Sequence, residues 1–455
     1  MANPVRRAAN RLSIGVEKYM PHSFIFVVVL TVIAYVAALA LTPTGPFEIV
    51  TEWYGQFWGF LEFGMQMTLI IVTGYGIATA PITRKLIRYL ATLPNSSAQA
   101  YLSVVLVGSG LAFFNWGLGM VAATFYAITL GAFRDDVDFG FLIATAYIGL
   151  WPGVLGSLSI TAPLLVNTPG HFLEGQIGII PLTETIFSPL HLTVVACTLL
   201  GSLALIYLMR PPESEVEPLK DDRLEELIPK YDEMEADGGT VTLAERLNQN
   251  RLFTAIMVVM GFSFIIYLAV FEGLIAALGL NSMNFILLMT GLALHGSPIS
   301  YVKAIADGVE KAAQVILQFP FYGGIQGILI GSGLAALIMD WVISVASTQT
   351  YPVLVFIGTG ILNIFVPSAG GQYIVTGEIL HGAADGIGTP HPVVVSAYTF
   401  GDGWTNMLQP FWALPVLGMA GLQVRNIWGY VMMGVIMWGL VAGTILLLFP
   451  VLGLV

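Results

Sequence analysis

The sequence predicts an all-α polytopic membrane protein built from two inverted repeats, and three observations lead to this fold class. Long apolar stretches run through most of the chain. The segment Ser97–Gly110 resembles Ser347–Gly360, with shared Ser, Gln, Tyr, Val and Gly residues at a constant offset of 250 positions. Each half is also interrupted by Gly, Pro and Asn at matched positions. Interrupted apolar helices in two related halves are typical of secondary transporters.

Composition requires a membrane protein. Hydrophobic residues make up 56% of the 455 residues and charged residues only 10%, whereas a soluble domain has about 25% charged residues. A membrane-spanning helix needs about 20 mostly apolar residues. The uninterrupted candidates are 22–42, 57–82, 183–209, 252–280, 283–300, 313–338 and 427–449. The first run lacks a small-residue cleavage site, so we expect it to remain as a helix.

Composition also excludes several function classes. The one cysteine, Cys197, lies in an apolar run, so neither a disulfide framework nor a cysteine metal site is possible. The six histidines are scattered, and the chain has no GxxxxGK loop and no basic patch of the kind that binds nucleic acid. We expect no metal, no organic cofactor and no nucleic-acid partner. The expected partners are the lipid bilayer and a small substrate, with a homodimer left open.

Basic residues mark the cytoplasmic loops of membrane proteins. The N-terminus carries Arg6, Arg7, Arg11 and Lys18 and is therefore expected in the cytoplasm. Residues 1–209 form the first repeat. Within it, 98–133 has two short apolar legs around a polar tip at Phe113–Gly119, which predicts a re-entrant helical hairpin covered by other protein. Residues 139–166 predict a discontinuous span, broken at Trp151–Gly153.

Residues 210–250 are the one long polar stretch. Eleven acidic and three basic residues fall between Glu213 and Asp237. This segment accounts for most of the net charge of −11. It predicts an acidic cytoplasmic linker between the repeats, helical around Arg223–Leu227.

The second repeat, 251–455, is predicted to run in the opposite direction. Lys303 and Lys311 lie on a short amphipathic cytoplasmic segment, and the base-free loop Asp340–Ser347 lies outside. A second hairpin covers 348–381, with its tip at Val366–Gln372. A second broken span covers 392–421, interrupted at Gly401–Asn406. The total is about nine full spans and two hairpins. We expect a prokaryotic inner membrane protein with its C-terminus outside.

Helix ends inside a bilayer are chemically useful because their backbone groups are unpaired. A helix N-terminus suits a carboxylate, a C-terminus or an unwound carbonyl suits a cation, and glycine lets a ligand approach the backbone. A single helix break more often serves helix packing than ligand binding. Four helix interruptions at matched positions of a repeat favour a shared substrate site. The predicted substrate-binding residues are Asn115, Trp116, Gly117, Gly119, Ser368, Gly370, Gly371, Gln372, Trp404, Thr405, Asn406 and Gln409.

No Arg or Lys lies at the hairpin tips or helix breaks, so a small monoanion fits this site better than a polyanion. Five aromatic residues near the interruptions could line a short apolar pocket, although an interfacial belt or core packing is the favoured interpretation. They are Phe114, Trp116, Trp404, Phe411 and Trp412.

Asp402 is the most informative single residue. A carboxylate inside a broken span is costly and usually functional. It could bind a coupling Na⁺, carry a coupling proton, or cap the second half-helix as an N-cap residue. We predict a coupling-cation site at Asp402 and Asn406, with Na⁺ and H⁺ both open.

Two stretches resemble the short-chain fatty acid transporter family: Val366–Gln372 (VPSAGGQ) and Gly401–Pro415 (GDGWTNMLQPFWALP). Phe113–Gly119 (FFNWGLG) is similar to the same family's first-half signature. The resemblance implies uptake of short monocarboxylates such as acetoacetate or butyrate. It also implies a place in a wider ion-transporter superfamily, in which paired hairpins move against a scaffold as an elevator. That superfamily's Ser-Asn-Thr tip signature is absent here, so the coupling ion stays open.

Three other functions remain as alternatives. A dicarboxylate or amino-acid carrier of the same superfamily is disfavoured by the lack of basic residues at the tips. An intramembrane aspartyl protease needs two membrane aspartates, one in a GxGD motif, and Thr399–Asp402 lacks the first glycine. A passive anion channel would conduct substrate without accumulating it.

Overall fold

The computed structural model describes residues 23–219, 242–271, 273, 278–364 and 369–454, and every regular element in these ranges is helical. The predicted all-α fold class is therefore confirmed. In chain order the α-helices are α2 (Ser23–Leu41), α3 (Pro46–Phe57), α4 (Leu61–Thr79), α5 (Pro81–Ala91), α6 (Ser97–Phe114), α7 (Trp116–Phe133), α8 (Phe139–Leu155), α9 (Thr161–Val166), α10 (Glu174–Ile177), α11 (Pro189–Met209), α13 (Leu243–Asn248), α14 (Arg251–Phe271), α15 (Leu280–His295), α16 (Pro298–Gly331), α17 (Leu334–Val345), α18 (Tyr351–Asn363), α19 (Ala369–Ile387), α20 (His391–Asn406), α21 (Pro410–Ala420) and α22 (Val424–Val451).

Six of the described helices are long and apolar enough to cross a membrane. A seventh crossing is possible if Ile316–Gly331, the second part of α16, forms one bent span with α17. The two helices meet at an angle of 74°. The chain is therefore a multi-pass membrane protein. The predicted layout of nine spans and two re-entrant hairpins stays a prediction. A span that is broken into two helices is not counted here, because each of its parts is shorter than a full crossing.

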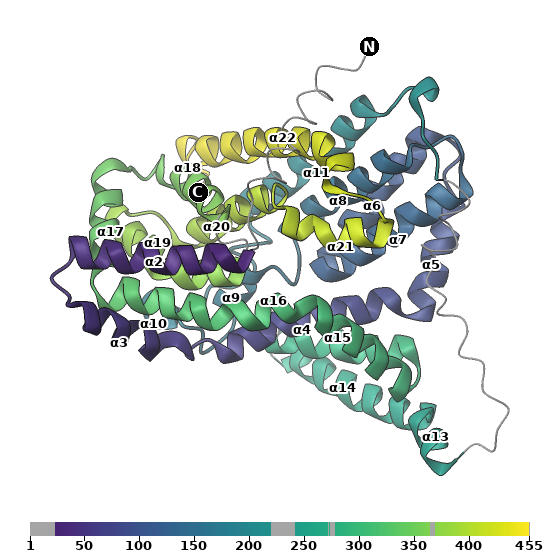
Figure 1. Cartoon of the computed structure of the whole chain (residues 1–455), viewed down its shortest axis with the longest axis horizontal. Helices are drawn as coiled ribbons and strands as arrows, with labels where there is room; N and C mark the ends of the chain where they lie inside the picture. The colour runs from purple at the N-terminus through teal and green to yellow at the C-terminus, as the bar shows by residue number, and fades with distance from the viewer. Residues whose placement is uncertain (1–22, 220–241, 272, 274–277, 365–368, 455) are drawn as a thin grey trace.

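The helices form two groups that lie side by side (Figure 1). We call α2–α4 and α14–α16 the flanking group, because α16 packs on α2, α3 and α4, and α15 packs on α4 and α14. We call α6–α9, α11 and α18–α22 the central group. The two groups meet where α4 packs on α7 and α16 packs on α19. Helices from both halves of the chain contribute to each group.

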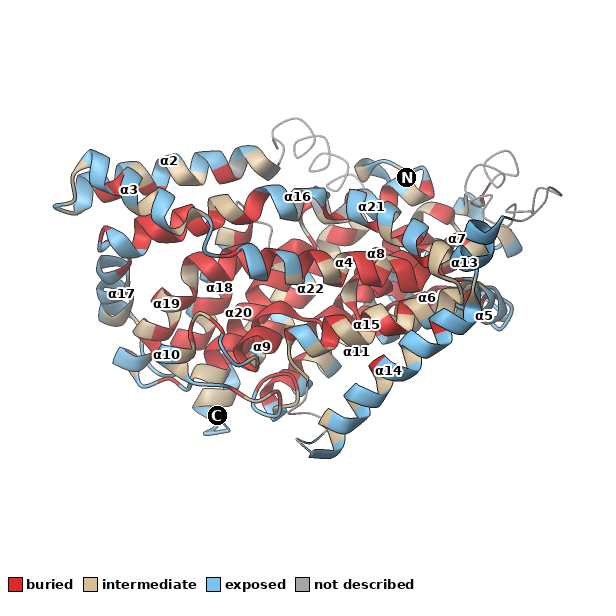
Figure 2. Ribbon diagram, turned by 90° about the horizontal axis from the view of Figure 1, so that it is seen from below, coloured by how far each residue is buried: buried red, intermediate tan, exposed pale blue. Residues whose placement is uncertain are grey.

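Buried residues are dense on helices α7, α8 and α20 of the central group, whereas α14 is mostly exposed (Figure 2). Every residue of α8 except Gly140 is buried. On α14 only Thr254 and Gly261 are buried. The exposed apolar side chains of α14 are suited to contact with lipid, because the hydrocarbon chains of the bilayer surround them as a protein core would.

Helices α6 and α7 form a tight antiparallel hairpin around Asn115. The backbone of Asn115 is extended (φ −152°, ψ 126°), and its side chain caps α7 by accepting a hydrogen bond from the backbone N–H of Leu118 at 2.7 Å. Gly119 lies against Ala112 on the opposite leg, so close that a Cβ at Gly119 would collide with the Ala112 backbone. The glycine is therefore what allows the two legs to approach.

Helices α18 and α19 are also joined along their length, although they pack on one another less closely than α6 and α7 do. The Gln372 side chain donates to the carbonyl of Thr359 at 2.8 Å, and the Tyr351 hydroxyl donates to the carbonyl of Leu380. The residues that these contacts join are offset by 250 positions from the register of Gly119 and Ala112 in the first hairpin, which equals the offset of the sequence repeat.

Both helix breaks lie further along the chain than predicted. The predicted break at Trp151–Gly153 is wrong, because α8 continues through Pro152 to Leu155 and the non-helical segment is 156–160. The predicted break at Gly401–Asn406 is also wrong, since those residues complete α20 and the gap is 407–409. Proline and glycine are tolerated inside membrane helices when neighbouring groups form hydrogen bonds with the freed backbone groups. Their positions in the sequence therefore did not mark where α8 and α20 end.

The second half shows two further differences. Lys303 does not lie on a short separate segment but on α16, a single helix of 34 residues. Asp340 is not in a loop, because α17 continues to Val345. In the linker, the described residues form a 3-10 turn at Glu213–Glu215 and helix α13. The predicted helix around Arg223–Leu227 lies outside the described residues.

Candidate binding pocket between the two hairpins

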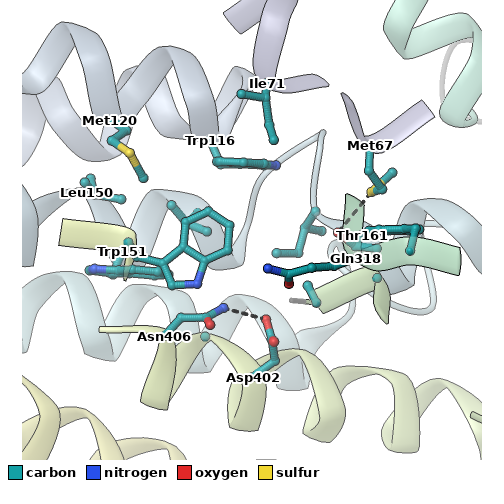
Figure 3. Close-up of a pocket in the computed structure, with 17 residues that line it drawn as sticks. Met67, Ile71, Trp116, Met120, Leu150, Trp151, Thr161, Gln318, Asp402 and Asn406 are labelled. Atoms are coloured by element: carbon teal, nitrogen blue, oxygen red, sulfur yellow. Dashed lines mark hydrogen bonds between the residues drawn. The ribbon is translucent and has the colours of Figure 1, made fainter. Parts of the chain in front are cut away.

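A cavity lies where the flanking and central groups meet (Figure 3). The volume open to the centres of water-sized molecules is about 70 Å³, which is room for several waters or a small organic anion. The lining residues are Met67, Ile71, Trp116, Met120, Leu150, Trp151, Val154, Ile160, Thr161, Gln318, Phe319, Ala369, Gly370, Asp402, Gly403, Asn406 and Trp412.

The cavity is lined almost symmetrically by the two halves of the chain. Met120 in the first hairpin corresponds to Gly370 in the second at an offset of 250, and both line the cavity. Trp151 and Asp402 correspond at an offset of 251, one on each broken helix. The sequence repeat therefore brings matched positions to one place, with different side chains at them.

Several helix ends point at the cavity. Residues in the first turns of α7, α19 and α21 line it, as does the last turn of α20. The N-terminal turns supply partial positive charge, and the C-terminal turn supplies partial negative charge. The cavity thus has separate regions suited to an anion and to a cation.

Asp402 is the one charged residue among the described residues that line the cavity. Its side chain is 2% exposed. One carboxylate oxygen, Oδ2, accepts a hydrogen bond from Asn406 Nδ2 at 2.9 Å, one helical turn further along α20 (Figure 3). The other oxygen, Oδ1, has no protein partner. An unsatisfied buried carboxylate oxygen is costly unless a proton or a cation completes it.

The N-cap role considered for Asp402 is wrong. Asp402 lies inside α20, four residues before the end of that helix at Asn406. The N-cap of the following helix, α21, is Gln409, and its side chain makes no capping hydrogen bond. The carboxylate therefore does not serve to start a helix.

Two further polar residues line the cavity from the first half. The indole N–H of Trp151 is buried and has no hydrogen-bond partner. The Thr161 hydroxyl contacts only Met67 Sδ, at 3.6 Å, which is a weak acceptor. Both groups can donate to a ligand oxygen. From α16, the Gln318 side-chain oxygen accepts a hydrogen bond from the Tyr322 hydroxyl at 2.9 Å, which orients the amide.

The rest of the lining is apolar. Met67, Ile71 and Met120 lie along one side (Figure 3). Trp116 and Trp412 pack edge to face, with ring centroids 5.4 Å apart. Trp116 was a predicted substrate-binding residue, whereas for Trp412 the sequence favoured an interfacial belt or core packing; both line the cavity. The side chain of Phe411 is outside the described part of the structure, and Phe114 is 56% exposed and does not line the cavity.

Of the predicted substrate and cation residues, Trp116, Gly370, Asp402 and Asn406 line the cavity. Ser368 lies outside the described residues. The other predicted residues pack nearby and hold the hairpins to the helix breaks, so the structure does not bring them to the cavity. They are Asn115, Gly117, Gly119, Gly371, Gln372, Trp404, Thr405 and Gln409.

The first-half residues in this group position the hairpin tip. Asn115 is fully buried and donates from Nδ2 to the carbonyl of Ile70 on α4 at 3.2 Å. Gly117 lies against the backbone of the same helix. The tip is also joined to the first break, because the Trp116 N–H donates to Ser159 Oγ at 3.0 Å.

The second-half residues do the same. Gln409 Nε2 donates to the carbonyls of Asn363 and Ile364, at 3.1 and 2.7 Å. Thr405 Oγ1 donates to the carbonyl of Gly360 at 2.8 Å. Trp404 turns away from the cavity and donates to the carbonyl of Val435. Gly371 lies against the Tyr322 ring. These contacts satisfy backbone groups that the interruptions leave open.

Sequence reasoning missed the lining residues on α4 and α16. Met67 and Gln318 face the cavity from these two flanking helices. The two positions differ by 251, so the repeat offset could have paired them. The site candidates were selected because they lie at hairpin tips or helix breaks. Neither Met67 nor Gln318 lies next to such an interruption. Among the described residues, no group of three or more His, Cys, Asp or Glu side chains could hold a metal ion.

Comparisons with known proteins agree with this architecture. The profile of a family described as short chain fatty acid transporter matches residues 4–449. A Haemophilus influenzae protein is 35% identical over 442 residues, which cover 95% of this chain and 97% of its own length. An Escherichia coli protein is 35% identical over 431 residues, covering 94% and 96%. Each is described as an inferred short-chain fatty acid transporter.

One solved structure is similar over nearly the whole chain. It is the crystal structure of the YdaH transporter of Alcanivorax borkumensis, described as having an unusual topology. The TM-score is 0.59 and the sequence identity 14%, and the match covers 95% of this chain and 99% of that one. At this identity the likeness supports the fold alone.

Proposed function

The chain belongs to the short-chain fatty acid transporter family, a family of transport proteins rather than enzymes, and from this premise we propose that it carries short monocarboxylates across the membrane together with a cation. The observation that carries this proposal is the cavity between the hairpins. It has one buried carboxylate, no basic side chain among its described lining residues, and a largely apolar wall.

The two ends of a short fatty acid match different parts of the cavity. A carboxylate is stabilised by the partial positive charge at helix N-termini, here those of α7 and α19, and by the indole N–H of Trp151 and the hydroxyl of Thr161. A short alkyl chain is stabilised by burial against Met67 and Met120, at roughly 0.8 kcal/mol per CH₂ group. A second carboxylate would find no basic partner.

A coupling cation follows from charge balance. Asp402 and a bound monocarboxylate would place two negative charges in a cavity of low dielectric, which is unfavourable unless a cation enters with the substrate. Asp402 Oδ1 has no protein partner and can take a proton or contribute to a Na⁺ site with Asn406 and the carbonyls at the end of α20. Both ions remain candidates.

Alternating access is proposed to occur by movement of the central group against the flanking group, as an elevator. The cavity is lined by both groups, with Met67 and Gln318 on the flanking side and the hairpins on the central side. Relative movement would therefore open the cavity by separating its two walls. The basic-loop pattern supports a prokaryotic inner membrane location with a cytoplasmic N-terminus and an external C-terminus. Reporter fusions at Asp237 and Val455 should report opposite sides.

Uptake into proteoliposomes tests the proposal. Purified protein is reconstituted and supplied with labelled acetate, butyrate, hexanoate, succinate or alanine under an imposed Na⁺ gradient, an imposed H⁺ gradient, or neither. We expect accumulation of butyrate under one of the two gradients and little uptake of succinate or alanine. Accumulation of succinate or alanine instead of butyrate would support the wider-superfamily alternative. Butyrate flux that never exceeds equilibrium under either gradient would support a passive channel.

A further inference from the structure

A second pocket lies away from the cavity between the hairpins. It is formed by α5, the end of α15 and the first turns of α16. Its chemistry-bearing residues are Arg84, Lys85, Arg88, His295, Lys303 and Asp307. Four positive charges and one negative charge give a formal net charge of +3 with the histidine neutral. The transport proposal makes no use of this pocket.

One wall of the pocket is held in place by His295. Its Nε2 contacts the carbonyl of Gly76 on α4 at 2.7 Å, and its Nδ1 contacts Ser300 Oγ on α16 at 2.9 Å. A neutral ring satisfies both contacts if Nε2–H donates to the carbonyl and Nδ1 accepts from the hydroxyl. His295 therefore ties α4, α15 and α16 together, and the pocket is part of the built structure.

The opposite wall, α5, is amphipathic. Ile82, Leu86 and Tyr89, spaced at four and three residues, are 57%, 51% and 63% exposed. Residues at this spacing share one face of a helix. Arg84 and Arg88 belong to a different face, which lines the pocket. A helix with exposed apolar residues on one face and basic residues on another is suited to the membrane surface.

We propose that this pocket binds a phosphate group at the membrane surface, and that an anionic phospholipid supplies it. Phosphate oxygens are matched by clustered Arg and Lys side chains, and basic pockets between membrane helices on the cytoplasmic side suit anionic headgroups. Lys303, in this pocket, belongs to the segment that the charge pattern assigns to the cytoplasm. The exposed apolar face of α5 places acyl chains next to the headgroup.

The site is positioned to affect movement between the two groups of helices. α5 packs on both α15 and α7, so it contacts the flanking group and the first hairpin. The guanidinium of Arg84 lies 5.9 Å from the Phe125 ring centroid on α7. The Tyr126 hydroxyl on α7 donates to the carbonyl of Leu90 on α5 at 3.2 Å. A headgroup bound here would therefore bridge the parts that the transport proposal has moving.

Lipid binding to the intact, delipidated protein tests the inference. Copies of bound cardiolipin, phosphatidylglycerol and phosphatidylcholine are counted by native mass spectrometry, and thermal stability is followed as each lipid is added. Inorganic pyrophosphate forms a separate arm that represents a soluble phosphate source. The double variant K85Q/K303Q removes two exposed pocket charges. The control R251Q/R425Q removes two exposed basic residues at the starts of α14 and α22, and K85R/K303R keeps the pocket charge.

We expect cardiolipin to bind at least tenfold more tightly than phosphatidylcholine. K85Q/K303Q should weaken cardiolipin binding tenfold or more, because each charge near the surface contributes about a factor of five. R251Q/R425Q should leave it unchanged, and K85R/K303R should retain it. If pyrophosphate binds in a way that depends on Lys85 and Lys303 and cardiolipin does not bind, the pocket is a phosphate site whose ligand is soluble rather than a lipid. Equal binding of all lipids without pyrophosphate binding, or equal weakening by both Gln pairs, would overturn it.

Discussion

At the scale of single residues, Asp402 presents an incomplete site. One carboxylate oxygen is held by Asn406 and the other is buried without a protein partner. A residue needed only for folding would be expected to satisfy both oxygens, because an unpaired buried acceptor destabilises the folded state by about 1–3 kcal/mol. The geometry therefore favours a role in which a proton or metal ion completes the carboxylate during transport.

We expect Asp402→Asn to abolish gradient-driven accumulation of substrate while the protein still folds. Asparagine has nearly the same shape, and its oxygen can still accept from Asn406, but it carries no charge to neutralise. Uptake into proteoliposomes and the monodispersity of the purified variant are the two measurements. Asp340→Asn, at an exposed position on α17, is the control and should transport normally. Normal accumulation by Asp402→Asn would eliminate a coupling role.

Met120 is expected to limit the chain length of the substrate. It is buried on α7 and lines the cavity. Met120→Ala enlarges the apolar wall, so uptake of hexanoate relative to acetate should rise about tenfold, a typical effect of fitting one or two methylene groups. Met283→Ala, on α15, creates a comparable buried cavity outside the site and controls for destabilisation. An unchanged hexanoate-to-acetate ratio in Met120→Ala would place the alkyl chain elsewhere.

At the scale of elements, the hairpins depend on close approach of their legs. Gly119 has no room for a side chain because a Cβ would meet the backbone of Ala112. Gly110, on the first leg, has nothing within 4 Å of the same atom. These two glycines have the same chemistry and opposite surroundings, so they form a matched pair for substitution.

Gly119→Ala should destabilise the protein by about 1–3 kcal/mol, as overpacking of a tight interface does. Gly110→Ala should be neutral or slightly stabilising, since alanine has the higher helix propensity. Thermal unfolding of the two variants in one detergent compares them directly. The interpretation fails if both substitutions shift the unfolding temperature in the same direction by the same amount.

The sequence predicted the helical class and the contributions of Trp116, Gly370, Asp402 and Asn406 to one pocket. The helical class is confirmed, because composition is directly visible in the residues. The four residues line one cavity, and their binding of substrate or cation stays a prediction. The positions of the breaks were wrong because Pro152 and Gly403 remain helical. Helix ends here depend on contacts between distant segments, such as the Leu158 N–H donating to the carbonyl of Phe113 at 2.7 Å. A local pattern does not contain such contacts.

At the scale of the whole molecule, the cavity lies between two groups of helices that share both halves of the chain. The same boundary continues beyond the cavity, where the segment after α9 meets the start of α15. The Leu280 N–H donates to Thr168 Oγ1 at 2.9 Å. A Cβ built at Gly279 is 3.7 Å from Thr168 Cβ, within the range of about 3.5–4.5 Å found in disulfides.

This pair gives a direct test of movement between the groups. In a Cys197→Ala background, Thr168→Cys combined with Gly279→Cys should form a disulfide under mild oxidation that joins α9 of the central group to α15 of the flanking group. If transport requires the two groups of helices to move past one another, oxidation should abolish uptake and reduction should restore it. The oxidised protein should still bind butyrate, because the cross-link holds it in the conformation that the structure represents. Each single variant should transport equally under both conditions, because a disulfide needs both thiols. Full uptake by a completely cross-linked double variant would mean that α9 and α15 stay together throughout the cycle, and the elevator would have to be replaced by movement of the hairpins alone.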